Sequence, residues 1–200
     1  MKYLAIILVG YLLGSMSPAA LIAKLKNKNL REHGTGNLGA TNTMLNFGKL
    51  YGAIVMIFDM AKAFISVKLA KLIMPGVIIA GLLGGGAAIL GHCYPFYMKF
   101  KGGKGLASFG GMVLAYDPGI FFVLLTVTVI AMLTFNHSVA MPIMGATLFP
   151  FMAGAHDESL SVFLLAAAIG MLIIVKFIDN LKKAREGSDI KPRSFIKKTS

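Results

Sequence analysis

The sequence predicts an all-α integral membrane protein with about seven transmembrane helices, from its hydropathy, its repeated apolar stretches and the placement of its charges. Of the 200 residues, 56% are hydrophobic and only 14% are charged, and the mean hydropathy is +0.76. A single soluble core of this length could not bury so much apolar surface. We therefore expect lipid to surround most of the chain, so that function resides on the helices or on their loops.

Seven apolar stretches follow one another along the chain. They are residues 3–23, 51–74, 77–90, 106–116, 120–135, 139–153 and 160–175. A spanning helix needs about 20 apolar residues, and fewer where neighbouring helices shield it. The first stretch lacks a convincing cleavage site, so we interpret it as a retained span and not as a signal peptide. The stretch 106–116 is short and contains Gly110 and Gly111, which leaves both a full crossing and a re-entrant half-helix open.

Basic residues concentrate in alternate connections between these stretches. Sixteen of the 20 lysines and arginines lie in residues 24–50, in residues 91–105 and in the C-terminal segment that starts at Lys176. Because positively charged loops stay in the cytoplasm, this asymmetry predicts an outside N-terminus and a cytoplasmic C-terminus. An odd number of spans, such as seven, fits that orientation.

These assignments predict one multi-span membrane domain over residues 1–190. Its cytoplasmic substrate loops would be residues 24–50, 91–105 and 176–190. Residues 191–200 form a basic tail, which we expect to be disordered near the lipid surface.

The net charge and the cysteine content narrow the partners. The formal net charge is +12, which in a membrane protein indicates loops that face anionic lipid, so we expect no nucleic-acid partner. Cys93 is the only cysteine, which excludes an intramolecular disulfide and a multi-cysteine metal site. The residues also show no cluster of metal ligands, and we expect neither a metal nor another cofactor.

The first basic loop contains a glycine-dense turn before a predicted helix, and from Gly34 to Asn42 it reads GTGNLGATN. Glycine adopts left-handed conformations readily, so backbone N–H groups here can point at an anion, and the N-terminus of the following helix adds its positive dipole end. We expect this loop to bind a phosphate group. Gly34, Gly36 and Gly39 also satisfy G-x-G-x-x-G, but no buried strand precedes them, which argues against a dinucleotide site. An ordinary connecting loop is the alternative, and we favour the anion site.

The second basic loop places lysines among glycines, and from Gly91 to Gly105 it reads GHCYPFYMKFKGGKG. It is not a Walker A motif, which would need glycine at Met98 and a hydroxyl residue at Gly105. Backbone amides with a lysine charge are again suited to phosphate. Lys99 and Lys101 could instead extend toward lipid headgroups, whereas Lys104 lies between two glycines. A lone histidine such as His92 is more often a packing residue than a catalyst.

Together the two loops resemble the bacterial acyl-phosphate-dependent glycerol-3-phosphate acyltransferases, which carry the motifs GSGNxGATN and GHxxPxFxxFKGGKG. The resemblance is specific in residues and in order, and it extends along essentially the whole chain. Gly14-Ser15 and Phe58-Asp59 with Lys62 are also similar to the family. Asp59 and Lys62 are spaced i, i+3 within an apolar helix, so we expect them to form a mutual ion pair.

The resemblance implies a membrane acyltransferase of phospholipid biosynthesis in the bacterial plasma membrane. Its partners would be acyl phosphate, glycerol 3-phosphate and membrane lipid, and its products lysophosphatidate and phosphate; the sequence predicts no oligomeric state. Acyl phosphate carries a good leaving group, so the protein need mainly align the hydroxyl and stabilise developing charge. No covalent nucleophile is required.

The same resemblance implies roles for particular residues. Catalytic positions at the glycerol phosphate are Thr35, Lys104 and Asn180. Positions near the acyl phosphate are Asn37, Thr41, Asn42 and Gly103. Further substrate-binding positions are Gly36, Gly39, His92, Gly102 and Lys183.

Three departures from the family pattern bear on activity. Thr35 replaces a serine but keeps a hydroxyl, whereas Leu45 stands where the family has an arginine. Phe177 stands where the third family motif, which here ends with Gly187-Ser-Asp189, has a histidine. A catalytically silent lipid-binding paralogue is therefore one alternative. A transporter of a phosphorylated metabolite is another, although the polar motifs lie in loops and not near mid-bilayer.

Overall fold

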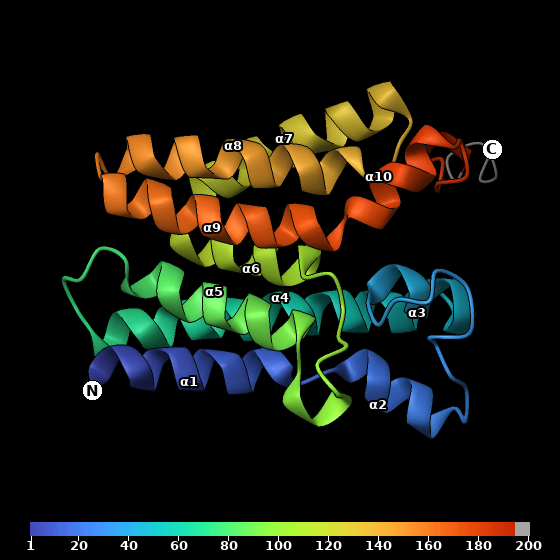
Figure 1. The fold of residues 1–200 in the computed structure, drawn as a ribbon, viewed down its shortest axis with the longest axis horizontal. Helices are drawn as coiled ribbons and strands as arrows, with labels where there is room; N and C mark the ends of the chain where they lie inside the picture. Colours follow the sequence, from blue (N-terminus) through green and yellow to red (C-terminus); the bar gives the residue numbers. More distant parts are fainter. Residues whose placement is uncertain (195–200) are drawn as a thin grey trace. The chain divides into compact units, whose positions relative to one another are not determined.

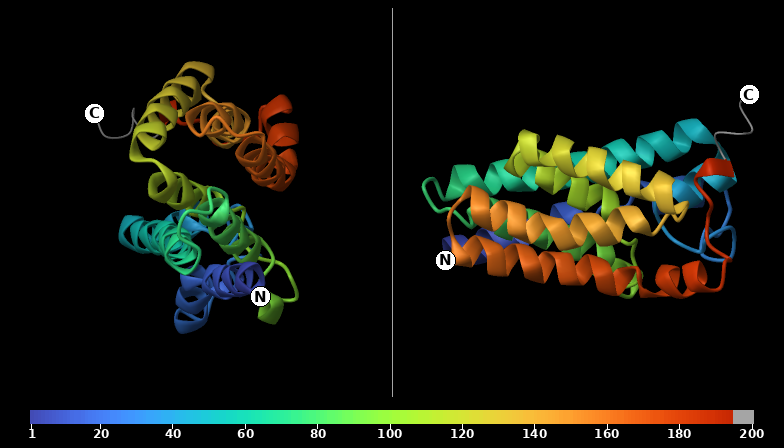
Figure 2. Two further views of the ribbon diagram at one scale, coloured as in Figure 1. Left: turned by 90° about the vertical axis from the view of Figure 1, so that its left-hand side faces the viewer. Right: turned by 90° about the horizontal axis from the view of Figure 1, so that it is seen from above.

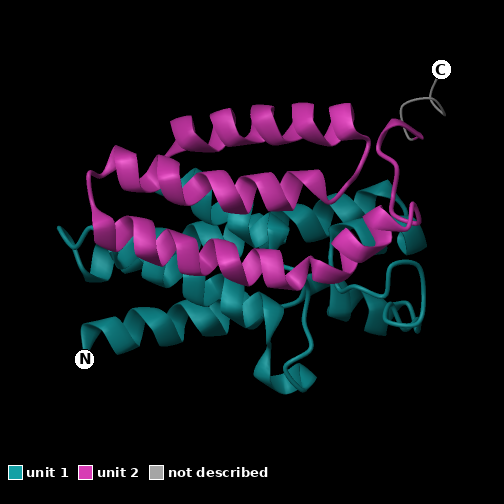
Figure 3. Ribbon diagram, turned by 45° about the horizontal axis from the view of Figure 1, so that its top comes forward, with its two compact units in different colours: residues 1–116 teal, residues 117–200 magenta. Residues whose placement is uncertain are grey.

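The computed structural model describes residues 1–194, and every regular element in that range is helical, which confirms the all-α prediction. The described chain divides into two compact units (Figure 3), and the single multi-span domain over residues 1–190 stays a prediction. Unit 1 comprises residues 1–116 and unit 2 begins at Asp117.

Four helices of unit 1 run side by side: α1 (Lys2–Ser15), α4 (Lys49–Ile73), α5 (Ala80–Cys93) and α6 (Leu106–Tyr116) (Figures 1 and 2). Small residues allow these helices to approach closely. A Cβ on Gly14 would collide with the Ala88 carbonyl between α1 and α5. A Cβ on Gly111 would collide with the Met60 carbonyl between α4 and α6. The glycines therefore set the helix spacing of this unit.

The first predicted span, residues 3–23, is interrupted in the structure by a two-residue break. Helix α1 ends at Ser15, Met16 and Ser17 are extended, and α2 covers Pro18–Leu25. Proline disfavours the helical conformation of the residue before it, and its own missing N–H suits the first helical position. The Ser17 hydroxyl accepts from Ala20 N at 3.3 Å and so caps α2.

Beyond this break, α2 and α3 (Ala40–Phe47) lie at one end of unit 1 (Figure 1). A small apolar cluster joins them to α4, and its buried members include Ala19, Leu30, Leu38 and Val55. Leu30 and Leu38 belong to the connection between α2 and α3, so this loop is anchored by its own leucines. The 3₁₀ helix η1 (Phe96–Met98) follows α5 and carries Met98, which packs against the same cluster.

Unit 2 contains α7 (Pro118–Phe135), α8 (Ala140–His156), α9 (Leu160–Lys176) and α10 (Ile178–Arg185). Helix α7 starts with a side-chain cap, since Asp117 Oδ1 accepts from Ile120 N at 2.7 Å. Helices α8 and α9 pack closely at Gly170, where a Cβ would collide with the Ala146 carbonyl. Helix α10 is bent from α9 by 50°.

Three described stretches are long and apolar enough to cross a membrane: residues 2–25, which join α1 and α2, together with α4 and α7. The α9–α10 pair makes a fourth if it counts as one bent span. Helix α6 has 11 residues, about 16 Å of helix, which is roughly half of a hydrocarbon core. The predicted number of seven spans stays a prediction.

Residues 191–194 contact the end of α7 within unit 2, and the disordered tail over residues 191–200 stays a prediction. The Arg193 guanidinium Nε donates to Leu133 O at 2.8 Å, and Arg193 N donates to Asn136 Oδ1 at 3.0 Å. These bonds connect residues 191–194 to the end of α7. Residues 195–200 lie outside the described part of the chain.

Candidate substrate site at two glycine loops

The connection from α2 to α3, residues 26–39, is the first glycine loop. Gly34 and Gly36 have φ values of +61° and +70°, a left-handed conformation that suits glycine. Gly39 is the N-cap residue of α3, and it offers no side chain to the first-turn N–H groups. Those amides and the helix dipole therefore face the loop with the character of an anion site.

Asn42 holds this loop in shape from the first turn of α3. Its side chain is fully buried; Oδ1 accepts from Thr35 N at 2.8 Å, and Nδ2 donates to Leu30 O at 2.8 Å. A Cβ on Gly34 would collide with Asn42 Oδ1, which explains the glycine. The Asn42 amide therefore makes hydrogen bonds to the loop backbone, and its predicted contact with acyl phosphate stays a prediction.

The other predicted residues of this loop lie nearer the surface. Thr35 and Thr41 are exposed, while Gly36 and Asn37 are partly buried. The Asn37 amide lies over Gly39, where a Cβ would come within 3.0 Å of Asn37 Nδ2. This arrangement leaves two hydroxyls and one amide around the start of α3.

The second glycine loop, residues 94–105, folds back on the end of α5. Gly102 N donates to Cys93 O at 3.0 Å, and Gly103 N donates to His92 O at 3.1 Å. A Cβ on Gly102 would collide with the His92 carbonyl, so a larger residue could not make this return. Gly105 has a φ of +83° and Phe109 N donates to its carbonyl at 2.7 Å, which starts α6.

The two loops meet inside unit 1. The Arg31 guanidinium of the first loop donates to Lys101 O of the second. A Cβ on Gly103 would come within 2.7 Å of Leu38 O, so the chain around Gly103 lies against the chain just before α3. The structure thus brings the predicted positions of both loops, including Lys104 beside Gly103, into one region.

Three buried ionisable side chains lie beneath the second loop. Asp59, Lys62 and His92 are 2%, 4% and 7% exposed. Lys62 Nζ lies 2.7 Å from Asp59 Oδ1, which confirms the predicted ion pair. His92 Nδ1 lies 2.9 Å from Lys62 Nζ and 3.3 Å from Asp59 Oδ1. The sequence carried no signal for this third partner, because His92 is 30 positions away from Lys62.

Unit 2 carries the remaining candidates, Asn180 and Lys183. Asn180 lies partly buried in the first turn of α10, and Lys183 is exposed one turn later. Their predicted contacts with substrate stay predictions. Phe177, at the bend between α9 and α10, is buried.

A polar clasp, formed by His137, Asp189 and Lys191, connects the end of α10 to the α7–α8 connection within unit 2. His137 Nδ1 lies 3.0 Å from both Asp189 carboxylate oxygens, and Lys191 Nζ lies 2.9 Å from Asp189 Oδ1. Burial by itself would raise the pKa of Asp189, but the hydrogen bonds and positive charges of Lys191 and His137 together lower that pKa below its usual value.

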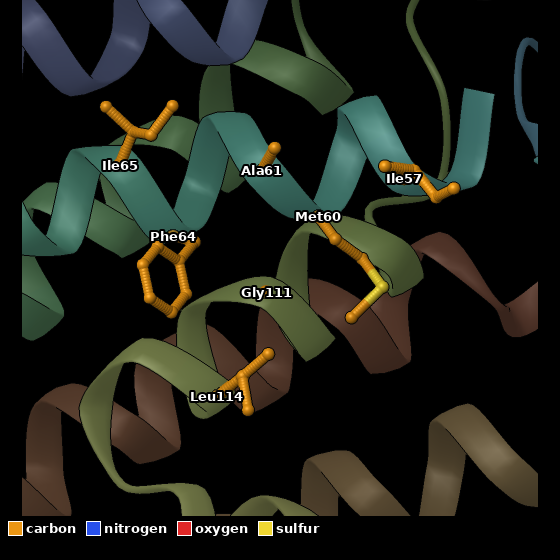
Figure 4. A pocket seen from close by; sticks show the side chains of 7 residues that line it. All are labelled: Ile57, Met60, Ala61, Phe64, Ile65, Gly111 and Leu114. Atoms are coloured by element: carbon orange, nitrogen blue, oxygen red, sulfur yellow. The ribbon is translucent and has the colours of Figure 1, made fainter. Parts of the chain in front are cut away.

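An apolar groove of about 300 Å³ runs between α4 and α6 (Figure 4). Its lining comes from two helices of unit 1 and consists of Ile57, Met60, Ala61, Phe64, Ile65, Gly111 and Leu114. Gly111 and Leu114 lie about two turns beyond Gly105, where the second loop ends. The groove has no charged residue in its lining.

The fold and the two loops define a class: a helical membrane protein whose polar site is built from loops at the helix ends. Comparison with known proteins narrows this class. Residues 4–187 match the family model described as glycerol-3-phosphate acyltransferase. A glycerol-3-phosphate acyltransferase of Thermosipho melanesiensis is 36% identical over 195 residues, which cover 96% of this chain and 93% of the relative. A glycerol-3-phosphate acyltransferase of Aquifex aeolicus is 36% identical over 193 residues, which cover 94% of this chain and 98% of the relative.

Two solved structures agree with the sequence comparisons. The crystal structure of PlsY, an integral membrane glycerol 3-phosphate acyltransferase, in its glycerol 3-phosphate form has a TM-score of 0.88 and 32% identity over 96% of each chain. The lysophosphatidic acid form of PlsY has a TM-score of 0.85 and 30% identity over 96% of this chain and 95% of the other. The present chain belongs to the glycerol-3-phosphate acyltransferase family and is a multi-pass membrane protein.

Proposed function

We propose that this protein transfers a fatty acyl group from acyl phosphate to the 1-hydroxyl of glycerol 3-phosphate, without acyl-CoA, in the bacterial plasma membrane. The observation that carries the proposal is the meeting of two glycine loops at the start of α3, with Gly103 against Leu38 and Arg31 bonded to Lys101. Two phosphate-bearing substrates need two anion sites close together. The glycine loops supply backbone amides, a helix N-terminus and a lysine for that purpose.

In this reaction the substrate hydroxyl attacks the carbonyl carbon of acyl phosphate. The new ester C–O bond forms, the bond between the acyl carbon and the phosphate oxygen breaks, and the hydroxyl proton leaves with the phosphate. The protein aligns the two substrates and stabilises charge on the carbonyl and phosphate oxygens. We assign Thr35, Lys104 and Asn180 to glycerol phosphate, and Asn37, Thr41 and Gly103 to the neighbourhood of acyl phosphate.

The acyl chain needs an apolar path away from this polar end. The groove between α4 and α6 starts within a few turns of the second loop, and its lining is entirely apolar. We assign the chain of the acyl donor to this groove, since each buried methylene contributes about 0.8 kcal/mol.

The test is an assay on the purified protein with acyl phosphate and glycerol 3-phosphate, in which lysophosphatidate is followed. We expect turnover with acyl phosphate and none when acyl-CoA replaces it. Turnover with acyl-CoA alone would contradict the assignment of the donor.

A silent lipid-binding paralogue is the second candidate, and two observations favour it. Leu45 is 48% exposed on α3, where a cation could reach the site from the helix, and Phe177 is buried where the family has a histidine. If the unmodified chain shows no turnover and the combined Leu45→Arg and Phe177→His chain does, the paralogue is correct. If the unmodified chain turns over, Leu45→Arg should only lower the KM for glycerol 3-phosphate.

We further propose seven spans, with an outside N-terminus and all three basic loops in the cytoplasm. Single cysteines at Thr35, Lys99 and Ser188 should then resist a membrane-impermeant thiol reagent in intact cells and react after lysis. The native Cys93 is fully buried, so the unmodified chain is the blank. Labelling of any one of the three from outside would refute a shared cytoplasmic site.

A further inference from the structure

Lys62 is the hub of a polar network that the proposed chemistry does not use. Its ammonium group has three protons, and the described structure offers three acceptors at hydrogen-bonding distance. They are Asp59 Oδ1 at 2.7 Å, Met16 O at 2.7 Å and His92 Nδ1 at 2.9 Å. An ion pair buried among apolar helices is costly unless such bonds satisfy it, so its presence calls for a role.

The first of these connections ends at the broken span. Met16 lies in the extended segment between α1 and α2, where helix geometry leaves backbone carbonyls without an intrahelical partner. Lys62 satisfies Met16 O, and the hydroxyl of Tyr97, from η1, donates to Ser15 O at 2.6 Å. Two side chains therefore bond to backbone carbonyls at the break: the Lys62 ammonium from α4 and the Tyr97 hydroxyl from the second loop.

The second connection ends at the second loop. His92 Nδ1 faces Lys62 Nζ at 2.9 Å and Asp59 Oδ1 at 3.3 Å, which leaves Nε2 on the opposite edge of the ring. That edge of the ring faces Gly103, because a Cβ on Gly103 would collide with Nε2. His92 O also accepts from Gly103 N at 3.1 Å. His92 therefore contacts Gly103 through both its ring and its backbone.

We propose that Asp59, Lys62 and His92 are positioning residues for the second glycine loop. Asp59 holds the Lys62 ammonium, Lys62 holds the His92 ring and the α1–α2 break, and His92 sets the position of Gly103 against Leu38. Lys104 follows Gly103 directly, so the network determines where its charge lies. The kinetic consequence rests on the proposed function, in which this loop binds phosphate; the structural consequence does not.

The experiment compares Lys62→Met with Lys68→Met. Both changes remove one lysine charge from α4, but Lys68 is exposed and lies over the Phe64 ring, outside the network. Hydrogen exchange by mass spectrometry on the detergent-solubilised full chain reports the loop directly, through the peptide covering residues 99–105. We expect exchange there to accelerate by about ten-fold or more in Lys62→Met, with α7–α9 unchanged, and no change in Lys68→Met.

The kinetic arm uses the acyltransferase assay on the same proteins. In Lys62→Met we expect the KM for at least one phosphate substrate to rise by about ten-fold or more while kcat changes by less than about three-fold. His92→Phe should give the same pattern. Because both residues act on the loop in series, the double variant should be no worse than the poorer single variant.

If Lys62→Met does not fold, the paired Asp59→Asn/Lys62→Met variant leaves no unpaired charge and takes its place. Unchanged exchange in residues 99–105 would overturn the proposal, whatever the activity. A fall in kcat with unchanged KM would also overturn it, since that pattern indicates a catalytic residue. If no form of the protein turns over, the proposed function fails and the exchange result alone decides this inference.

Discussion

The two glycine loops are held in place in different ways. The first takes its shape from near neighbours, since Asn42 bonds Thr35 N and Leu30 O, 7 and 12 positions away. The second depends on distant parts of unit 1: His92 contacts Lys62, 30 positions away, and Tyr97 bonds Ser15 O, 82 positions away. The first loop can therefore be disrupted by a change within itself. The second is sensitive to the packing of α1, α4 and α5.

The strongest test of this comparison is Asn42→Ala. The change leaves Thr35 N and the buried Leu30 O without their partner, at a cost of about 1–3 kcal/mol for the buried carbonyl. Because small displacements of positioning groups are costly, we expect kcat/KM to fall by at least about 100-fold, with the second loop unaffected in hydrogen exchange.

Thr43→Val is the matched control for Asn42→Ala. The Thr43 hydroxyl donates to Gly39 O at 3.0 Å, but Gly39 O also accepts from Thr43 N at 3.0 Å. Valine keeps the shape and the backbone bond, so its effect should be slight. If Asn42→Ala lowered kcat/KM no more than Thr43→Val does, the proposal that near neighbours hold the first loop would be refuted.

The next test is on the second loop, at Lys104→Ala. If Lys104 makes a charge-assisted contact with substrate phosphate, its loss should cost on the order of 2 kcal/mol in transition-state stabilisation, about 30-fold in kcat/KM. The hydrogen exchange of residues 99–105 should stay unchanged, unlike that of Lys62→Met. This separates a residue that binds substrate from one that positions the loop. Unchanged kinetic constants would show that the second loop does not bind phosphate through this lysine.

What the sequence could predict follows the same division. Glycine-rich loops, the Asp59–Lys62 pair at i, i+3 and the helical character of the apolar stretches are local signals, and all three are present in the structure. Pro18 is also a local signal, for the break between α1 and α2, because it is the first residue of α2. Local signals are sufficient where the residues concerned lie within a few turns of one another.

The rest depended on tertiary contacts. Nothing in the spacing of Lys62, His92 and Met16 indicates that one ammonium contacts both of the others, since helix packing brings them together. Likewise, the motif does not indicate that the Asn42 side chain bonds to Thr35 N and Leu30 O. A motif identifies which residues a site needs but not which of them support the others.

The groove between α4 and α6 provides a smaller test, which extends the comparison from the loops to the helices. Leu114→Trp adds bulk to the groove lining (Figure 4). If the acyl chain lies there, we expect the preference for long over short acyl phosphates to fall by about four- to fifteen-fold, as for the loss of one or two buried methylenes. Ile130→Trp, on the exposed face of α7, is the control. An equal change in acyl-chain preference in both variants would show that the acyl chain does not lie in this groove.

The smallest effect is expected at the clasp of unit 2, which, like the second loop, is held by residues far apart in the sequence. His137 and Lys191 face Asp189 and lower its pKa, so the folded state favours the ionised form of this carboxyl group. The resulting stability is present above the ordinary carboxyl pKa and is lost as pH falls through the lowered pKa.

At pH 7 we expect Asp189→Asn to be less stable by about 1 kcal/mol, measured as a lower Tm in detergent. This difference should shrink as pH falls below the ordinary carboxyl pKa of about 4, where the unfolded chain takes up the proton, and it should vanish below the lowered pKa of folded Asp189. Asp179→Asn, exposed in the first turn of α10, should change stability by no more than about 0.5 kcal/mol. A Tm difference for Asp189→Asn that persists unchanged to low pH would mean that packing, and not the charge of Asp189, holds the clasp.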